Sequence, residues 1–326
     1  MKDVMKNKLI LILLSFFLIH TGQILAQNYP NKTIRLVVPS AAGGTIDIIA
    51  RGVVQKMSES LKQPIIIDNR PGASGIIAMD IVAKSPPDGY TLILATSGTF
   101  AANLISHNKL PFDIIKDFSP VSIITESTFA LAIHPSLQIN SLQDFTNLAK
   151  SKPNTITYGS FGIGSISHIL TESFNIQAGI QLTHIPYKSG PDTLNGLIGG
   201  QVSSSMDALT VLLPQLKSKR IQILAIGNTK RSPLAPDIPT FIELGYTGYT
   251  AMVWYGLFAP GNTPKDIISK LNSEIMKSLA ESETKEKLQS IGLNPIGSSP
   301  DGLAQQIKLD IEKFTAISNV SKFVQP

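Results

Sequence analysis

The chain has 326 residues, a formal net charge of +5 and no cysteine. The lack of thiols excludes a disulfide framework, a thiolate metal site and a cysteine nucleophile, so a hydrophobic core must hold the fold together. The positive excess is mild and the lysines are scattered, apart from a short run at residues 217–220. Nucleic-acid binding requires a focused basic patch, so we expect no nucleic-acid partner. A chain of this length is typical of two domains.

The N-terminus predicts a secretory signal peptide over residues 1–26. A basic start with three lysines precedes the apolar run Leu9–Ile19, which is shorter than a membrane span. Ala26 supplies a small residue at the expected cleavage point. We therefore expect periplasmic localisation of the chain from Gln27 onward; the alternative is an uncleaved membrane anchor. The leader's three lysines and one aspartate carry +2 of the total, which leaves +3 for the remainder, a field that favours small anions.

Short apolar strands alternate with helices along the first third of the chain. We expect strands at Thr33–Val38, Pro64–Asn69 and Tyr90–Ala95 and a helix at Thr45–Leu61. Gly72–Ala83 is expected to be mostly helical after a Gly-Ala-Ser-Gly turn. Apolar runs of this length between helices are typical of buried parallel strands in an α/β fold.

The middle of the chain predicts a second α/β unit, and the end of the chain adds one strand and three helices. Val121–Ile124 and Phe129–Ile133 are predicted as two paired strand pieces. Ser282 is the expected N-cap of the second C-terminal helix. The further expected strands are Thr155–Tyr158, Thr183–Pro186, Val202–Asp207, Ile221–Ile226 and Trp254–Pro260, and the helices are Ser141–Lys150, Ser165–Gln177, Asp192–Ile198, Leu212–Ser218, Pro264–Glu281, Ser282–Ile291 and Pro300–Ala316.

Two glycine-bearing turns predict a site for an anion. Gly43 and Gly44 lie between the first strand and the helix that begins at Thr45, and residues 160–165 stand in the same relation to a strand and helix of the second unit. Backbone N–H groups at such turns and helix starts lack internal partners, and glycine lets a ligand approach them. Two such turns predict one cleft between two lobes.

Many short motifs occur in an order and spacing that resembles one known family. In the first unit these are Tyr29-Pro30, Val38-Pro39, Gly43-Gly44 with Asp47, Asn69-Arg70-Pro71-Gly72-Ala73 and Asp88-Gly89-Tyr90-Thr91-Leu92. Further along they are Tyr158-Gly159-Ser160, Gly162, Gly164-Ser165, His168, Pro186-Tyr187-Lys188, Gly199-Gly200-Gln201-Val202, Met206-Asp207, Pro236-Asp237-Ile238-Pro239-Thr240, Trp254-Tyr255-Gly256, Ala259-Pro260 and Thr263-Pro264. The chain from residue 27 onward is similar to the substrate-binding receptors of tripartite tricarboxylate transporters, the Bug proteins.

The resemblance implies a type II periplasmic-binding-protein fold, with two α/β lobes joined by two crossover strands and a ligand cleft between them. We expect the crossings near Ile124–Phe129 and Thr250–Tyr255, with lobe 1 formed by residues 27–125 plus 252–326 and lobe 2 by residues 126–251. The family binds small carboxylates, such as dicarboxylates, tricarboxylates, aromatic acids or acidic amino acids. It delivers them to membrane carrier subunits, without catalytic residues or a cofactor.

The sequence departs from the family pattern in two places. Many relatives carry an aromatic residue or Phe-Pro-Pro where this chain has Ser40-Ala41-Ala42, which predicts a smaller and more polar rim. Relatives often have Tyr-Lys-Gly where this chain continues from Tyr187-Lys188 into Ser189-Gly190-Pro191, which changes the distal wall of the pocket. Tyr187 and Lys188 are further candidates for that wall.

The predicted ligand site collects hydrogen-bond donors at the carboxyl ends of strands. Two roles stay open for each of three residues. Asp47 braces its loop or also contacts a ligand amine or hydroxyl, and His168 is a structural residue or a ligand contact. Asp207 orients a neighbouring loop or binds a ligand amine. The predicted contacts are Ser40, Ala42, Gly43, Gly44, Thr45, Asp47, Ala73, Ser74, Thr96, Ser97 and Thr99 in lobe 1, and Ser160, Gly164, Ser165, His168 and Asp207 in lobe 2.

Two other functions stay open at the level of the sequence. The chain could present its ligand to a two-component sensor kinase rather than a transporter. It could also be a secreted hydrolase that uses Ser160 or Ser165 with His168, although it lacks the Gly-x-Ser-x-Gly elbow of that class. The family resemblance implies that the chain is not an enzyme. We predict no metal site, because His20, His107, His134 and His184 have no metal-ligand spacing with carboxylates.

Overall fold

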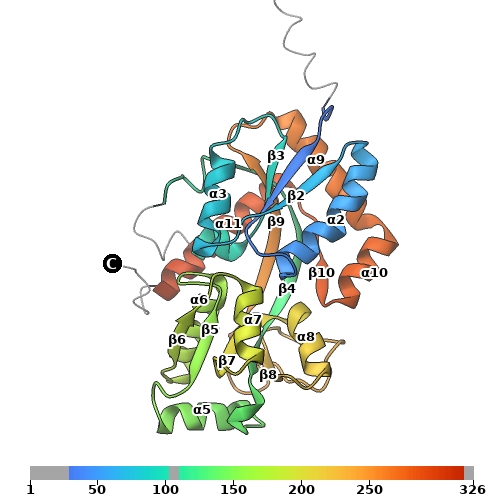
Figure 1. Cartoon of the computed structure of the whole chain (residues 1–326). Helices are drawn as coiled ribbons and strands as arrows, with labels where there is room; N and C mark the ends of the chain where they lie inside the picture. The colour runs from blue at the N-terminus through green and yellow to red at the C-terminus, as the bar shows by residue number, and fades with distance from the viewer. Residues whose placement is uncertain (1–28, 103–109, 319–326) are drawn as a thin grey trace, which may run out of the picture.

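A computed structural model describes residues 29–102 and 110–318, which form two α/β lobes, one above the other in Figure 1. The predicted signal peptide at residues 1–26 lies outside the described residues, as do His20 and His107. Within the described ranges, no helix combines the length and the apolar character needed to cross a membrane.

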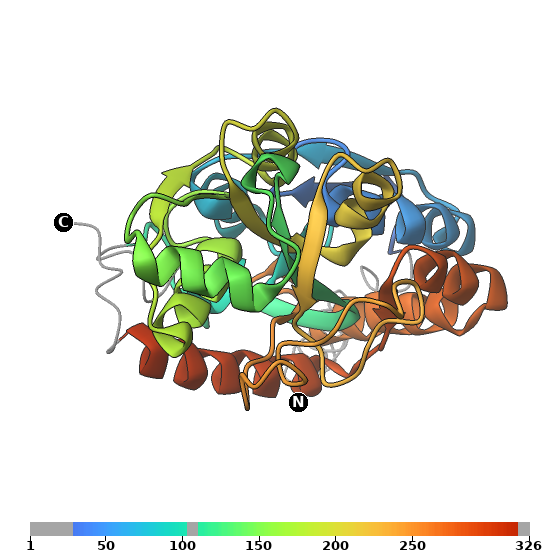
Figure 2. The same cartoon turned by 90° about the horizontal axis from the view of Figure 1, so that it is seen from below.

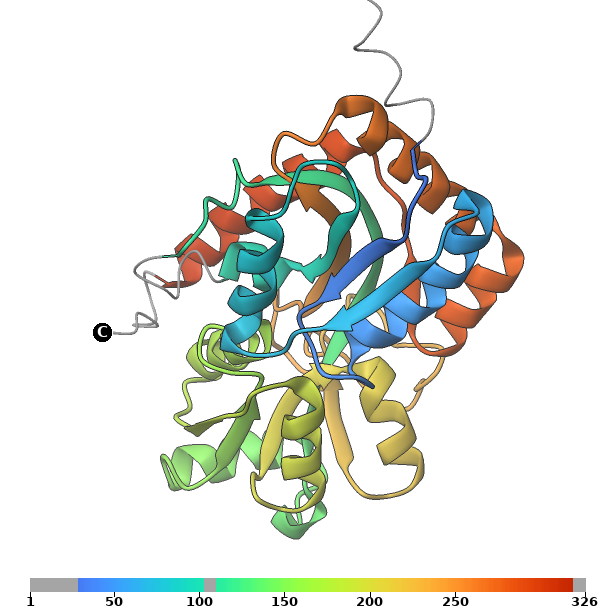
Figure 3. The same cartoon turned by 45° about the horizontal axis from the view of Figure 1, so that its top comes forward.

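The first lobe is built on a sheet whose parallel strands are β1 (Ile34–Val38), β2 (Ile65–Asn69) and β3 (Thr91–Thr96). Strand β9 (Met252–Pro260) extends it on the β3 side in antiparallel register. Figure 3 shows β1 and β2 directed toward the second lobe. Since ligands of open α/β sheets bind beyond the carboxyl ends of the strands, this direction sets where the first lobe can bind one.

Helices cover both faces of this sheet, which explains the nearly continuous apolar runs in its strands. Leu36 and Val38 pack on the face covered by α2 (Thr45–Leu61) and α9 (Lys265–Ala280). Val37, between them, packs on the opposite face. That face is covered by α3 (Ile76–Ala83) and α11 (Pro300–Ser318), and Figure 2 shows α11 running along one side of the molecule.

The second lobe has the same layered design. Its sheet joins parallel strands β7, β5 and β6 to an antiparallel partner from the crossover strand, and helices lie on both faces. Its elements are α5 (Leu142–Ser151), β5 (Thr157–Ser160), α6 (Ile166–Ala178), β6 (Thr183–Pro186), α7 (Gly190–Ile198), β7 (Ser204–Ala208), α8 (Leu209–Lys217) and β8 (Gln222–Ile226).

One long strand, β4 (Phe118–Ile133), passes from the first lobe into the second. It pairs with β9 as far as Thr128 and with β7 and β8 from Phe129 onward. The prediction of two separate strand pieces is therefore wrong. The polar residues between the two apolar runs resemble a turn, but they continue the pairing, and the Thr125 hydroxyl donates to the Asn294 carbonyl at 2.7 Å.

Several other expected boundaries differ from the structure. The turn expected ahead of the helix in Gly72–Ala83 is confirmed: a tight turn at Ala73–Gly75 precedes α3. Glu281, not Ser282, occupies the N-cap of α10 (Ser282–Ser290), and its side chain makes no capping bond. The short strand β10 (Leu293–Pro295) and a wide helical turn at Gly98–Ala102 were not predicted.

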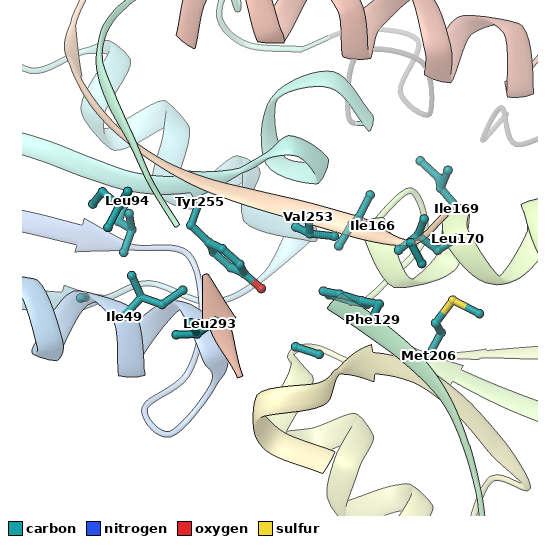
Figure 4. Packing of buried hydrophobic residues seen from close by; sticks show 14 of the residues in the cluster. Ile49, Leu94, Phe129, Ile166, Ile169, Leu170, Met206, Val253, Tyr255 and Leu293 are labelled. Atoms are coloured by element: carbon teal, nitrogen blue, oxygen red, sulfur yellow. The ribbon is translucent and has the colours of Figure 1, made fainter. Parts of the chain in front are cut away.

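The hydrophobic core continues through the crossing between the lobes. Phe129 on β4 and Tyr255 on β9 both belong to the cluster that reaches Ile49 in the first lobe and Ile169 in the second. Figure 4 shows the Tyr255 hydroxyl directed toward Phe129. The two crossover strands therefore bring buried aromatic side chains from β4 and β9 to the place where the lobes meet.

Candidate ligand-binding site

A cavity of about 340 Å³ lies between the lobes, with walls from both. Ten of the sequence-predicted contacts line it, which places the two glycine-bearing turns around one space. These residues are Ser40, Ala42, Gly43, Gly44, Thr45, Ser74, Thr96, Thr99, Ser165 and Asp207.

The other six predicted contacts do not belong to the cavity wall. They lie next to wall residues along the chain, and several of them bond to the loops that carry those residues. They are Asp47, Ala73, Ser97, Ser160, Gly164 and His168.

Several wall residues were missed by sequence reasoning. The aromatic walls Phe129 and Tyr255 come from the crossover strands, and a signal for Tyr255 existed in the Trp254-Tyr255-Gly256 motif. Lys188, a candidate from the sequence, lines the cavity, whereas Tyr187 lines a neighbouring surface hollow that shares Lys188. Other missed residues are Phe161, Ile166, Asn195, Thr210, Val211 and Gln215.

The loop in the first lobe is held by a buried carboxylate. The Gly43 N–H donates to Asp47 Oδ2 at 3.0 Å, and the Asn69 amide donates to Oδ1 at 3.0 Å. Arg51 donates to both carboxylate oxygens, at 2.9 and 3.1 Å. Burial favours the neutral acid, but the bonds from Arg51, Gly43 and Asn69 outweigh it and hold the pKa of Asp47 below its usual value. Asp47 therefore braces the loop from behind the cavity wall.

The loop in the second lobe is held by neutral histidines. The Gly164 N–H donates to His168 Nδ1 at 3.0 Å, and the His168 ring stacks on His184 with centroids 4.0 Å apart. His184 Nε2 and the Ser160 hydroxyl are 2.6 Å apart. Burial lowers the pKa of His168 to about 3, with a smaller contribution from His184, and burial lowers the pKa of His184 to about 4. Both rings are therefore neutral at neutral pH.

These bonds change which amides can meet a ligand. The prediction that the glycine amides of the turns remain unpaired is wrong for Gly43, Gly44, Gly162 and Gly164, each of which donates a hydrogen bond within its own loop. The first helical bonds are Ile48 N–H to the Gly44 carbonyl and Ile169 N–H to the Ser165 carbonyl. The amides at residues 45–47 and 166–167 precede those bonds, so the α-helical hydrogen-bond ladder does not itself engage them. The first turns of α2 and α6 are therefore the candidate donors for a ligand in the cavity.

The lobes are in contact at the edge of this cavity. The Ser74 hydroxyl donates to the Ile163 carbonyl of the opposite lobe at 2.7 Å. Ser74 has a φ of +51°, a left-handed conformation that is uncommon for a residue with a side chain. Gly98 approaches Ile166 so closely that a Cβ on residue 98 would lie 2.5 Å from the Ile166 Cβ. Glycine is therefore required at position 98 for the lobes to meet.

Two titratable groups lie in the deep part of the wall. Asp207 is 4% exposed, and its Oδ1 accepts the Ala208 N–H at 2.6 Å. Burial raises the pKa of Asp207 to about 8. Burial also raises the pKa of the Tyr255 hydroxyl, which interacts with Asp207 and bonds with the Ser127 and Thr45 side chains. This part of the wall is therefore mostly uncharged at neutral pH.

The arrangement gives no support to serine-nucleophile chemistry. Ser160 pairs with His184 rather than His168, is fully buried and is not part of the cavity wall. The Ser165 hydroxyl donates to the Gly162 carbonyl at 2.7 Å. Across residues 29–102 and 110–318, no group of three or more histidine, aspartate or glutamate side chains is arranged to hold a metal ion.

The family model of the tripartite tricarboxylate transporter family receptor matches residues 49–321. The chain belongs to this family. Protein BugT of Bordetella pertussis is 32% identical to it over 293 residues, which cover 90% of each chain. The resemblance inferred from the sequence is confirmed.

Solved structures agree with the two-lobed α/β fold. Rpa4515 of R. palustris with adipate has a TM-score of 0.87 and 34% identity, over 89% of this chain and 97% of that one. MatC of Rhodopseudomonas palustris with bound malate has a TM-score of 0.85 and 32% identity, over 89% and 99%. The expected periplasmic-binding-protein fold is confirmed, and the matched family is one of receptors.

Proposed function

We propose that this chain is an exported receptor that binds a small carboxylate between its lobes and delivers it to a tripartite tricarboxylate transporter. The observation that carries this proposal is that α2 and α6, from different lobes, begin at the wall of one cavity. The positive end of each helix dipole and the amides that precede its first helical bond favour an anion. Relatives crystallised with adipate and with malate support the same ligand class.

The proposal divides the predicted site into two groups. The ten predicted residues that line the cavity would touch the ligand or its ordered water. Asp47, Ser160, Gly164 and His168 would position the loops that carry the contacts. The lobe boundaries at residues 27–125 plus 252–326 and 126–251, and removal of residues 1–26 on export to the periplasm, form part of the proposal.

The energetics fit reversible capture. Each hydrogen bond to a charged group contributes about 1.5–3 kcal/mol, so four of them contribute roughly 6–12 kcal/mol before ordering costs are subtracted. A dissociation constant on the order of micromolar corresponds to about 8 kcal/mol. The first-turn amides are therefore sufficient without an arginine clamp, and release to a carrier remains feasible.

Binding is tested by thermal unfolding of the chain from residue 27 with dicarboxylates, tricarboxylates, aromatic acids and acidic amino acids. At a hundredfold excess over its dissociation constant, a ligand adds about 2.7 kcal/mol, which raises the Tm by roughly 5–10 °C. Val211→Trp should abolish this shift because the larger ring occupies the cavity. Lys217→Trp, an exposed position on the same helix, is the matched control and should keep it.

Delivery requires a separate measurement in cells. Deletion of the receptor gene should abolish uptake of the acid that binds, Lys217→Trp should restore uptake and Val211→Trp should not. A panel without any Tm shift would overturn the binding proposal. Binding with unchanged uptake in the deletion strain would overturn delivery alone.

A further inference from the structure

Half-buried apolar residues line the cavity from both lobes. Ile46 and Ile48 on α2, in the first lobe, and Leu194 on α7 and Val211 on α8, in the second, belong to its wall and keep part of their surface exposed. Apolar side chains that are partly exposed around one cavity are stabilised when an apolar group fills the space between them. The wall therefore provides contact surface for a hydrocarbon group.

The apolar wall residues of the second lobe lie at helical spacing. On α7 they are Pro191 and Leu194, and on α8 they are Val211 and Pro214. Residues three apart lie on the same face of a helix, so each helix contributes one apolar strip to the cavity wall. Leu194 also packs against the core cluster of the second lobe, which anchors the α7 strip to that lobe.

This apolar surface begins directly beside the proposed carboxylate site. A Cβ on Gly44, the N-cap of α2, would lie 3.4 Å from Pro191 Cδ of the opposite lobe. The first residues of α2 and α6, Thr45 and Ile166, line the same cavity. A ligand whose carboxylate binds at the start of α2 can therefore extend along α7 without leaving the cavity.

The wall has few groups that could satisfy further charges on a ligand. Among the described residues that line the cavity, Lys188 is the only basic one, and it is exposed. Asp207 is the only acidic one, and burial raises the pKa of its carboxyl group to about 8. The residues that follow the two strips along the chain, Asn195 and Gln215, carry neutral amides. A second or third carboxylate held against the strips would thus lose its hydration without gaining a cation.

We infer that the receptor selects carboxylates with a hydrocarbon body, aromatic or unbranched aliphatic, over compact polyanions such as citrate. This inference rests on the proposed function, because it presumes that a carboxylate group binds at the starts of α2 and α6. The hydrocarbon body packs between Ile46 of the first lobe and the Leu194 and Val211 strips of the second. Its contribution to affinity grows with the apolar area that it buries.

The test measures binding by isothermal titration calorimetry at pH 7. The probes are succinate, adipate and suberate, then butyrate, hexanoate and octanoate, and finally phenylacetate and citrate. The first two series vary the hydrocarbon length with and without a second carboxylate, and phenylacetate provides an aromatic body. Each added methylene group should tighten binding by about fourfold until the cavity is filled, the effect of about 0.8 kcal/mol per buried CH₂, and the heat-capacity change of binding should become more negative. Citrate should bind more weakly than the tightest of the other acids.

Leu194→Ala removes most of one apolar side chain from the α7 strip and keeps a good helix former. It should weaken binding of the tightest acid by about fivefold. Ile198→Ala is the matched control and should bind this acid as the parent chain does. Ile198 lies one turn later on α7, is half-buried and packs on the same core cluster, but it is not part of the cavity wall. Val211→Thr, which keeps the shape and replaces a methyl group by a hydroxyl, should also weaken binding of this acid by about fivefold.

The outcomes separate this inference from the proposed function. If succinate or butyrate binds and the longer acids bind no tighter, or if citrate binds most tightly, the selectivity for a hydrocarbon body is wrong and the proposed function stands. Equal losses of affinity in Leu194→Ala and Ile198→Ala would also overturn the selectivity, because the effect would then come from the packing of α7. If none of these acids binds, the proposed function fails for this panel, and the inference fails with it.

Discussion

The two loops at the cavity wall are held by the same kind of hydrogen bond, but the side chains that accept it differ in charge. In each, the N–H of a glycine donates at 3.0 Å to a side chain four residues later, from Gly43 to Asp47 and from Gly164 to His168. Each bond folds the loop back onto the start of its helix, and residues 45 and 166, where α2 and α6 begin, line the cavity. One acceptor is a carboxylate and the other is a neutral imidazole.

The surroundings explain the difference. Asp47 is buried but has Arg51 beside it, whose side chain is 58% exposed and brings a hydrated cation to the carboxylate. His168 lies under the ring of His184, which itself stacks on Tyr158 with centroids 4.8 Å apart. A carboxylate at that buried position would lose its hydration, whereas an imidazole can accept the bond in its neutral form. A loop near solvent can thus use an ion pair, and a loop over a packed core needs a neutral acceptor.

The largest expected effect is the loss of stability on truncating His168 or Asp47, the side chains that accept the glycine N–H in the two loops. His168→Ala removes a buried ring and leaves the Gly164 N–H without an acceptor, and should lower the free energy of unfolding by about 3 kcal/mol. Asp47→Ala removes less packing and should cost about 2 kcal/mol, because the amides of Gly43 and Asn69 lose their acceptor. Urea denaturation of the ligand-free chain measures both. A larger loss for Asp47→Ala would contradict the comparison.

The second effect is a difference in how His168 and Asp47 change the stability of the fold as the pH falls. The pKa of His168 is depressed in the folded state, so the unfolded state binds protons first, and stability falls as the pH drops from about 6.5 toward 3. The pKa of Asp47 is also depressed, but its contribution is lost only below its ordinary pKa of 3.8. Between pH 7 and pH 5, His168 alone should cost about 2 kcal/mol. His184, with a pKa of about 4, adds a further loss over this range, and Asp207, with a raised pKa, adds a gain, because its folded form binds the proton first. In urea titrations His168→Phe should therefore change the difference in stability between pH 7 and pH 5 by about 2 kcal/mol relative to the parent chain, and Asp47→Asn should leave that difference unchanged. Equal differences for all three proteins would refute the assignment.

The smallest effect is expected for Arg51, the exposed ion-pair partner of Asp47. In Arg51→Gln the Gly43 and Asn69 amides still bond the Asp47 carboxylate. Exposed ion pairs contribute little and are screened by salt, so the Tm should fall by only a few degrees at low salt, and the difference should shrink in about 1 M NaCl. Thermal scans at both salt concentrations measure it. A loss as large as that of Asp47→Ala would show that the ion pair, and not the carboxylate acceptor, holds the loop.

Local patterns in the chain predicted most of the fold, because strands and helices follow from the spacing of apolar residues. The helix expected at Thr45–Leu61 matches α2, and the strand expected at Thr183–Pro186 matches β6. The pattern failed at β4, where the polar residues 125–128 resemble a turn. Those residues stay in a strand because β9 supplies their pairing partners from more than 120 residues away, and a local pattern does not contain that information.

Sequence reasoning placed the candidate site on loops that line the cavity, but some of the residues it named lie behind the cavity wall. Gly164 and His168 were predicted as ligand contacts, yet they bond to each other behind the wall. Thr210 was missed because a threonine in the first turn of a helix is ordinary in sequence. Its place on the cavity wall is known only once the surrounding elements are placed.

The sequence by itself determined the alternation of strands and helices, the two glycine-bearing turns and the family, because each depends on residues that are close along the chain or on motifs in a fixed order. The tertiary structure decided which amides and side chains face the cavity. That choice depends on which groups are already satisfied by partners distant in sequence, such as His184 over His168 and Asn69 on Asp47. A ligand can bind only to the donors and acceptors that folding leaves unpaired.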